Sequence, residues 1–184
     1  MTANQVIKAY MRRGVEIGPF NLFGIRYSEN QKADVFNDII GCIADGILYY
    51  FDGTTDPGRR ATENRSNGAA HLCLGYHPDI WHIGIHGKKN PAFAHEAFVQ
   101  TAGPVTIWRD KNRNYEQDDF DMIEKGYFGI NLHRASIHGS DVIGPYSEGC
   151  QVTSEPDSLE MLLNLAKESG EKKFSYMLFD KGEV

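Results

Sequence analysis

The sequence lacks any long apolar run, and this absence argues against a helix that spans a membrane. No stretch approaches the roughly 20 apolar residues that such a helix needs. The first residues, MTANQVIKAYMRRGVEIG, also lack the apolar segment of a secretory signal peptide. We therefore expect no membrane insertion, synthesis in the cytoplasm, and delivery to any other compartment by a route without a signal peptide.

Positive charge is also scarce. The chain has 19 Lys and Arg against 25 Asp and Glu, which gives a formal net charge of -6 at pH 7. Proteins that bind DNA or RNA through the phosphate backbone cluster Lys and Arg to displace counterions. Nucleic acid is therefore not an expected partner.

Cysteine is rare, and the three that occur are odd in number and far apart. They form neither a closed disulfide framework nor a CxxC metal motif. Cys42 and Cys73 sit among aliphatic residues at strand-like spacing, which is typical of buried filler. Cys150 differs, because it follows Gly149 and a polar, histidine-containing segment. It is the candidate nucleophile.

What is present indicates one mainly β domain. With 184 residues, 41% hydrophobic residues and 19 glycines, the chain can bury a core and make many tight turns. We predict a single α+β domain over residues 1–184, a β-sandwich or barrel with a few short helices, in which residues 1–30 are a candidate N-terminal arm.

Local patterns place the elements. An amphipathic helix is predicted over Asn4–Arg13, with Val6, Ile7, Tyr10 and Met11 on its apolar side. Asp45-Gly46 predicts a two-residue hairpin turn between two β-rich runs. The polar stretch Thr54–Ala70 is an excursion between strands, or a flap over a groove. Further strands are predicted over His71–Tyr76, Ile80–Gly87, His95–Gln100, Gly103–Asp110 and Lys172–Asp180. Trp81, Trp108 and Phe128 are expected mostly in the core.

Two further elements flank Cys150. A strand over Tyr127–Leu132 would end at a histidine, His133. A helix is predicted from the spacing of Leu159, Leu162, Leu163 and Ala166, with Ser154 or Asp157 as N-cap and Gly170 as its end.

A cysteine nucleophile needs a base and an oxyanion site. The base lowers the barrier to thiolate formation, and backbone N–H groups bind the oxygen of the attacked carbonyl. Gly149 permits a sharp turn, so the amides of Gly149 and Cys150 are candidate oxyanion donors. His133 and His138 are candidate bases, and His133 is favoured because the end of a strand holds it rigidly.

The segment resembles the catalytic domain of L,D-transpeptidases. The signature of that family is a histidine followed at a limited distance by Ser/Thr-His-Gly-Cys; here Ser147, Gly149 and Cys150 match the turn. Sixteen residues separate His133 from Cys150, which selects His133 over His138. The Ser-x-Gly-Cys variant is similar to phage-associated cell-wall members.

The resemblance implies a mechanism and a substrate. Cys150 would attack a carbonyl of a peptidoglycan stem peptide and form an acyl-enzyme, with His133 as base and the backbone carbonyl of Arg134 as its orienter. The acyl group would pass to an amine or to water, so transferase and hydrolase activities stay open, and catalysis requires no cofactor. We expect Ser147, Tyr146 and His138 on the substrate side.

The chain departs from the family pattern at two places. Glu148 replaces the usual histidine of the turn, and Gln151-Val152-Thr153 lacks the arginine usually found two residues after the cysteine, which removes a carboxylate contact. These departures favour one alternative, a noncatalytic wall-binding or virion structural module that retains the fold. Delivery by a holin, as for a phage lysin, or as an effector toxin fits the absence of a signal peptide.

Metal ligands are the remaining candidates. The segment DKNRNYEQDDFD has oxygen-bearing side chains at the spacing of a twelve-residue calcium loop: Asp110, Asn112, Asn114, Asp118 and Asp121. Tyr115 occupies the sixth position, where glycine is usual, and a solvated acidic loop is the alternative. A bound calcium would be structural. His71, His77, His82, His86 and His95 match no zinc motif, so we expect structural or groove-lining roles for them.

Overall fold

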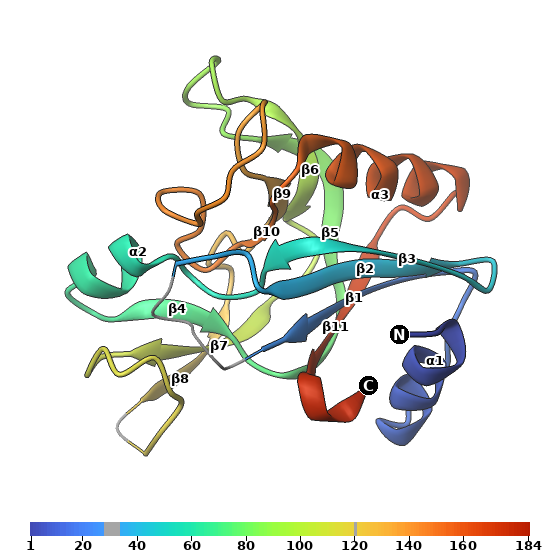
Figure 1. The fold of residues 1–184 in the computed structure, drawn as a ribbon, viewed down its shortest axis with the longest axis horizontal. Helices are drawn as coiled ribbons and strands as arrows, with labels where there is room; N and C mark the ends of the chain where they lie inside the picture. The colour runs from blue at the N-terminus through green and yellow to red at the C-terminus, as the bar shows by residue number, and fades with distance from the viewer. Residues whose placement is uncertain (28–33, 120) are drawn as a thin grey trace.

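A computed structural model describes residues 1–27, 34–119 and 121–184. The chain is 40% strand and 18% helix, which confirms a mainly β protein with short helices. Figure 1 shows one large sheet, with a small sheet and a short helix on its left and a longer helix along its upper side.

The strands fall into two sheets. A closed barrel contains β1 (Phe20–Arg26), β2 (Asp38–Ala44), β3 (Ile47–Thr54), β5 (Gly75–His86), β6 (His95–Gln100), β9 (Leu132–Arg134), β10 (Gln151–Thr153) and β11 (Phe174–Asp180). A three-stranded sheet contains β4 (Ala69–Leu72), β7 (Val105–Asp110) and β8 (Met122–Gly126). The helices are α1 (Ala3–Arg12), α2 (Arg59–Asn64), α3 (Pro156–Glu168) and the 3-10 turn η2 (Lys181–Glu183).

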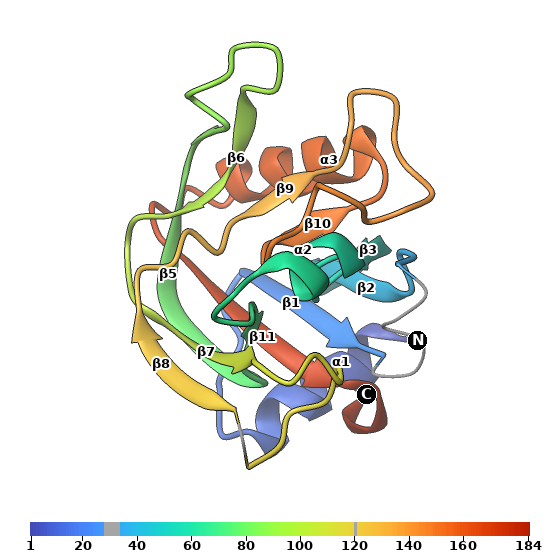
Figure 2. The same cartoon turned by 90° about the vertical axis from the view of Figure 1, so that its left-hand side faces the viewer.

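The barrel closes in the order β1-β11-β5-β6-β9-β10-β3-β2, and the small sheet has the order β4-β7-β8. Figure 2 shows the small sheet beside the barrel rather than inside it. Most neighbouring barrel strands are antiparallel, whereas β1 pairs with β11 and β9 pairs with β10 in parallel. Parallel neighbours require a long connection, and for β9 and β10 that connection carries the segment before Cys150.

Helix α1 packs on the barrel, so the described part of the predicted arm, residues 1–27, is not a separate arm. The Thr2 and Gln5 side chains form a capping box at its start. Val6, Ala9 and Tyr10 are buried, and the Tyr10 ring meets Phe179 of β11 edge-on at 5.3 Å between centroids. Met11, predicted on the apolar side, is 68% exposed. Strand β1, also within 1–30, belongs to the barrel; residues 28–33 lie outside the described residues.

The hairpin prediction is confirmed. Ala44 of β2 pairs with Ile47 of β3, and the two turn residues Asp45 and Gly46 have φ of 48° and 80°, as a two-residue hairpin turn requires. The strand prediction over His95–Gln100 is also confirmed as β6, and that over Gly103–Asp110 corresponds to β7. The excursion Thr54–Ala70 contains α2 and the start of β4.

The predicted strand over Tyr127–Leu132 is wrong. Strand β8 ends at Gly126 and β9 begins at Leu132. The Gln100 side chain takes the place of a neighbouring strand, because its Oε1 accepts the backbone N–H groups of Phe128 and Ile130 at 3.0 and 2.9 Å. Gly129 lies between them at φ 75°. A side chain can therefore satisfy an irregular backbone that periodicity alone presents as a strand.

The barrel interior is filled from alternating positions of its strands. Phe174, Tyr176 and Leu178 of β11 point inward, whereas Met177 and Phe179 belong to the cluster beneath α1. The predicted helix over the leucine repeat is α3, and its buried face is Leu159, Leu162, Leu163 and Ala166. Its N-cap is Glu155, not Ser154 or Asp157, because Pro156 occupies the first turn.

The predicted burial is confirmed for Cys42 and for both tryptophans but not for Cys73. Cys42, Trp81 and Trp108 are buried. Cys73 is only half-buried, because it lies just beyond the end of β4 rather than within a strand.

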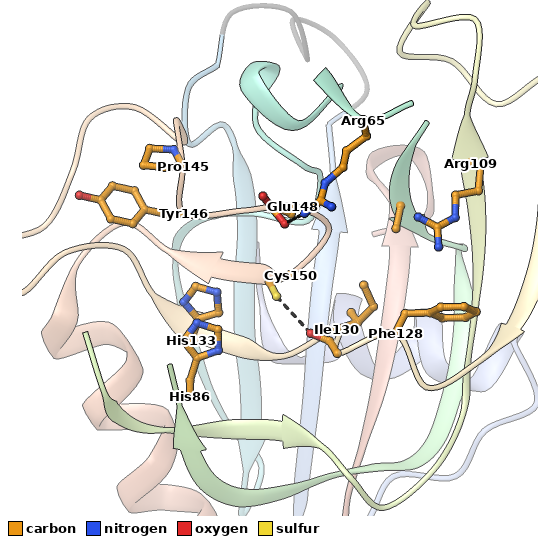
Figure 3. Close-up of a pocket in the computed structure, with 12 residues that line it drawn as sticks. Arg65, His86, Arg109, Phe128, Ile130, His133, Pro145, Tyr146, Glu148 and Cys150 are labelled. Carbon is orange, nitrogen blue, oxygen red and sulfur yellow. Dashed lines mark hydrogen bonds and ion pairs between the residues drawn. The ribbon is translucent and has the colours of Figure 1, made fainter. Parts of the chain in front are cut away.

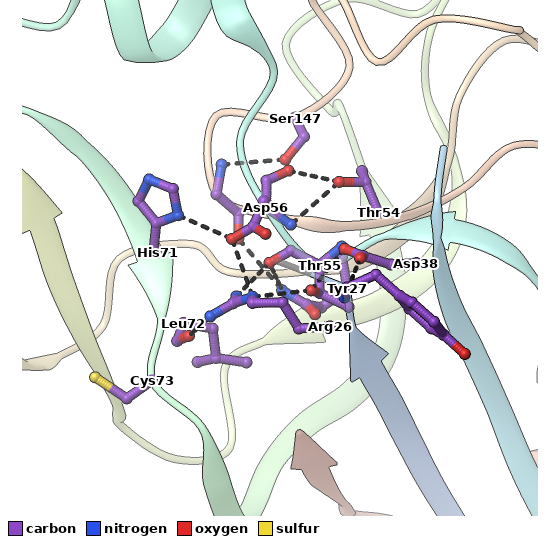
Figure 4. Close-up of polar contacts among 12 residues, drawn as sticks. Arg26, Tyr27, Asp38, Thr54, Thr55, Asp56, His71, Leu72, Cys73 and Ser147 are labelled. Carbon is purple, nitrogen blue, oxygen red and sulfur yellow. Dashed lines mark hydrogen bonds and ion pairs between the residues drawn. The ribbon is translucent and has the colours of Figure 1, made fainter. Parts of the chain in front are cut away.

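Arg26 ties the small sheet to the barrel (Figure 4). Its guanidinium lies at the end of β1 and donates to the carbonyl oxygens of Leu72 in β4 at 2.9 Å and of Thr55 at 2.7 Å. Its Nε lies 3.0 Å from the Asp56 carboxylate, which also lies 2.8 Å from Nδ1 of His71. All these side chains are buried, so one cation holds three segments together.

In the described part of the chain, none of the helices has the length and apolar character needed to cross a membrane.

Candidate functional site

Strand pairing brings His133 and Cys150 to the same place. His133 lies in β9 opposite Val152 of β10, and the Gln151 N–H donates to the Asn131 carbonyl at 2.8 Å. Adjacent strands are about 4.8 Å apart. Cys150, immediately before β10, therefore lies beside the start of β9. The sixteen residues between the two groups form the long connection that the parallel pairing requires.

The thiol and the imidazole face one pocket of about 490 Å³ (Figure 3). Residues from both sheets and from three connections line it: Arg65, Ala70, His86, Arg109, Phe128, Gly129, Ile130, His133, Pro145, Tyr146, Glu148 and Cys150. A pocket with a nucleophile, an imidazole and several polar groups is a suitable place for covalent chemistry.

His133 has the arrangement of a neutral base. Its Nδ1 lies 2.7 Å from the carbonyl oxygen of Arg134, and a carbonyl accepts only from N–H, so Nδ1 carries the proton. Its Nε2 is buried and has no hydrogen-bond partner among the residues that the structure describes. Burial, followed by the nearby His86, lowers the pKa of His133 well below its usual value. The ring is therefore neutral at pH 7, with its lone pair at Nε2.

His86 supports this ring. The two imidazoles stack at 3.8 Å between centroids and 14° between planes. The amide Nδ2 of Asn131 lies 3.0 Å from Nδ1 of His86, while its Oδ1 accepts the Gln100 N–H at 2.8 Å. Two strands thus fix His86 against His133. The sequence carried no signal for this contact beyond a histidine on a predicted strand.

Cys150 rests as a neutral thiol. Its sulfur donates to the carbonyl oxygen of Gly129 at 3.4 Å. Burial raises the pKa of the Cys150 thiol to about 11, and the backbone N–H of Asn131 opposes this increase. The pair is therefore a thiol and a neutral imidazole, and the proton has to move to His133 when the sulfur attacks.

Hydrogen bonds within the turn hold the residues that precede Cys150. Gly149 has φ 130°, and a Cβ there would lie 2.4 Å from the Ala70 carbonyl oxygen, so only glycine fits. The Ser147 hydroxyl accepts the Gly149 N–H at 3.2 Å and donates to the Cys150 carbonyl at 2.8 Å.

Two sequence predictions are corrected by this turn. Ser147 is fully buried, so it braces the turn and does not face the pocket. The Gly149 N–H is committed to Ser147 and is not an oxyanion donor in this conformation. The Cys150 N–H remains the candidate donor from this turn.

The structure places Tyr146 and His138, the other two residues predicted on the substrate side, in different surroundings. Tyr146 lines the pocket. His138 is exposed and is not among the residues that line it. Its backbone N–H donates to the Ser136 hydroxyl in a turn of its own. His138 therefore lies outside this pocket, and its placement on the substrate side stays a prediction.

Sequence reasoning missed the charged groups of the pocket. Arg65 follows α2, and Arg109 comes from β7. Arg65 forms an ion pair with Glu148, and the Nε of Arg109 donates to Glu124 at 3.0 Å. Both arginines come from segments far from Cys150 in the sequence, so no local motif contains them.

The candidate calcium loop folds around its own side chains. The Asp110 carboxylate accepts the N–H groups of Asn114 and Tyr115, each at 3.1 Å. The amides of Asn112 and Asn114 donate to Asp118 at 2.7 and 2.9 Å, and Asp121 accepts the Asp118 N–H at 2.9 Å. Tyr115 has φ 69°, the conformation for which glycine is usual.

No group of three or more His, Cys, Asp or Glu within residues 1–27, 34–119 and 121–184 is arranged to hold a metal. Calcium binding therefore stays a prediction. Each of the five histidines considered for zinc has another contact. His71 pairs with Asp56, and His86 lines the pocket. The others form hydrogen bonds: His77 and His95 with the backbone carbonyls of Cys73 and Phe93, and His82 with the Thr101 hydroxyl.

Comparison with known proteins found no family model, no curated protein and no solved structure that matches this chain.

Proposed function

We propose that this protein is a cysteine-dependent acyltransferase or peptidase that acts on peptidoglycan stem peptides, with an L,D-transpeptidase-like fold. One observation carries the chemistry. The buried His133 ring, with Nδ1 held by the Arg134 carbonyl, leaves Nε2 without a partner in the described residues, in the pocket that contains the Cys150 thiol. The substrate class rests on the resemblance of the Ser147–Cys150 turn to that family.

The geometry supports the following sequence of steps. As the Cys150 sulfur bonds to the substrate carbonyl carbon, its proton passes to Nε2 of His133. The carbonyl oxygen becomes an oxyanion, for which the Cys150 N–H is the candidate donor from the turn. The C–N bond then breaks, and His133 returns the proton to the leaving amine. An acyl thioester remains on Cys150.

The second half repeats the first in reverse. His133 removes a proton from an incoming amine or water molecule as that molecule attacks the thioester carbon. The C–S bond then breaks, and the Cys150 thiolate takes up the proton from His133. An amine gives a cross-link, and water gives hydrolysis. The pocket is open to solvent at Tyr146 and Glu148, so both acceptors can reach the site.

Replacement of the nucleophile tests the proposal. Cys150→Ala should lower the cleavage or cross-linking of purified muropeptides by about a thousandfold or more, with a melting temperature close to that of the wild type. Cys73→Ala is the matched control, because it removes a half-buried thiol that does not line the pocket. Mass spectrometry of the muropeptides separates cross-linked products from hydrolysed ones. Full activity of Cys150→Ala would contradict the proposal.

A noncatalytic cell-wall-binding or virion structural module is the second candidate. The observation that favours it is the resting thiol, which is neutral and bonded to the Gly129 carbonyl. Incubation with a carbapenem distinguishes the two candidates. An acylating enzyme gains the mass of the opened lactam on Cys150, whereas an inert thiol gains nothing. Delivery to the wall by a holin or a secretion system belongs to the same proposal and is tested by localisation in the producing cell.

A further inference from the structure

Val152 occupies the position at which the L,D-transpeptidase signature usually has an arginine, so that position supplies no positive charge in this chain. Val152, two residues after Cys150, is fully buried in β10. A charged side chain there would be buried without an ion-pair partner, which is energetically costly. Any positive group that contacts the substrate must therefore come from another element, and Arg65 and Arg109 are the basic residues among those that line the pocket.

Arg65 is already neutralised at the pocket rim. Its partner Glu148 lines the same pocket, and the two side chains are 54% and 60% exposed. An exposed pair of this kind contributes little binding energy. The Glu148 carboxylate also repels a second anion at that end. Arg65 is thus the weaker candidate for an anionic ligand.

Arg109 is placed differently. Only its Nε is engaged, by Glu124, which is not a lining residue. Its two terminal nitrogens have no hydrogen-bond acceptor in the part of the chain that the structure describes, and its side chain is 23% exposed. Figure 3 shows the guanidinium reaching inward above Phe128. A partly desolvated guanidinium with free terminal nitrogens is suited to bind a carboxylate through two hydrogen bonds.

An apolar floor connects this guanidinium to the nucleophile. The Phe128 ring lies 5.6 Å below Cζ of Arg109, and Ala70 and Ile130 continue the lining. The Cys150 thiol donates a hydrogen bond to the backbone carbonyl of Gly129, which lies between Phe128 and Ile130 in the sequence. A ligand that reaches from the sulfur to Arg109 crosses apolar side chains and ends at a cation.

We propose that Arg109 determines substrate specificity by binding a carboxylate on the acyl donor, so that acidic stem peptides are acylated onto Cys150 in preference to their amidated forms. This inference rests on the proposed acyl transfer and adds a substrate requirement to it. The acid lies at the Arg109 end of the pocket, because Glu148 disfavours an anion at the other end.

A pair of thiol probes tests the carboxylate site without any peptide. The Cys150 S–H adds across the double bond of 3-maleimidopropionic acid or of its primary amide, and the two differ by one charge. Peptide mass spectrometry measures the adduct at Cys150. We expect the acid to react about tenfold faster than the amide, the size of one charge-assisted hydrogen bond. Arg109→Gln should reduce this acid-to-amide ratio to about one.

Arg113→Gln is the matched control. It removes the same charge from an exposed side chain in the loop after β7, and it should leave the ratio at the wild-type value. An unchanged ratio in Arg109→Gln, or an equal loss in both variants, would overturn the inference, because the effect would then come from the general field of the protein.

Glu124→Gln provides a second test if Arg109→Gln melts below the assay temperature. This variant keeps the cation and removes the carboxylate that competes for it, so the ratio should increase. An unchanged or smaller ratio contradicts the inference.

Stem peptides separate this inference from the proposed function. Equal turnover of acidic and amidated donors would refute the specificity alone. An intact probe ratio with no turnover of either donor would refute the acyl transfer alone.

Discussion

At the scale of single residues, the site combines a neutral base with a neutral thiol. His133 is buried against His86, and burial shifts the pKa of the ring downward and that of Cys150 upward. A thiolate–imidazolium pair would need the opposite shifts. The structure therefore favours proton transfer during attack over a preformed ion pair.

The pH dependence of alkylation tests this resting state. Because the pKa of Cys150 is raised to about 11, the thiolate fraction at pH 7 is small and grows as the pH rises. The rate of reaction of Cys150 with iodoacetamide should increase about tenfold per pH unit from pH 7 to pH 10. Stopped-time mass spectrometry in a Cys73→Ala background provides the measurement. A plateau below pH 8 would indicate an ion pair instead.

His86 is predicted to position His133 and to keep it neutral. Burial, followed by the charge that His86 carries when it is protonated at low pH, lowers the pKa of His133. His86→Phe keeps a stacked ring without that charge, so it should move the acid limb of kcat/KM to higher pH. His86→Ala removes the stack and should also lower kcat, by about tenfold. A merely structural role would reduce activity at every pH and leave the limb in place.

At the scale of elements, the decisive feature is the parallel pairing of β9 with β10. The turn Ser147–Cys150 is closed by its own hydroxyl and fits only because Gly149 has no side chain. The backbone between β8 and β9 is irregular, and the Gln100 side chain satisfies it. Rigid elements and a braced turn hold the thiol and the imidazole, whereas the two arginines come from other segments, Arg65 after α2 and Arg109 in β7.

The loop between β7 and β8 carries the calcium prediction. Asp110 already accepts two backbone N–H groups, and Asp118 accepts two side-chain amides; a bound cation would turn the oxygens of those amides inward. After chelation, calorimetric titration with calcium should release heat, and the melting temperature should increase. Asp110→Ala should remove both effects. Absence of heat and of a melting shift in the wild type would leave a solvated acidic loop.

At the scale of the whole molecule, the two sheets must stay in place for the pocket to exist. Ala70 and Arg109 come from the small sheet, while His133 and Cys150 belong to the barrel side. Arg26 links the two through Leu72, Thr55 and Asp56. Burial and the Asp56 charge raise the pKa of Asp38, which Arg26 lowers.

Removal of this cation should be strongly destabilising. Arg26→Met removes the guanidinium that pairs with the buried Asp56 carboxylate, and breaking a buried ion pair in this way typically costs about 3–5 kcal/mol. The pKa of Asp38 is raised in the folded state, so the folded protein binds this proton more tightly than the unfolded chain does. The free energy of unfolding therefore decreases as the pH rises from the pKa of Asp38 in the unfolded chain to its pKa in the folded protein.

Urea unfolding should therefore show a larger loss of stability at pH 8 than at pH 5. Asp56→Asn in the same chain should restore part of it. An equal loss at both pH values would show that charge is not the cause.

The sequence alone determined what depends on neighbouring residues. Asp45-Gly46 specified a hairpin, the leucine repeat specified α3, and the Gly149 turn beside Cys150 marked the candidate nucleophile. Each is a local conformational preference that needs no distant contact. The selection of His133 over His138 came from spacing within a resemblance; His133 lines the pocket, and its role as a base stays a prediction.

Only the tertiary structure decided which residues surround the Cys150 thiol. His86, Arg65 and Arg109 reach the pocket because barrel closure and the packing of a second sheet bring remote segments together. No local pattern encodes that closure, since strand partners are chosen by long-range packing. For the same reason Ser147 became a brace rather than a substrate contact, and the stretch after Gly126 became an irregular segment rather than a strand.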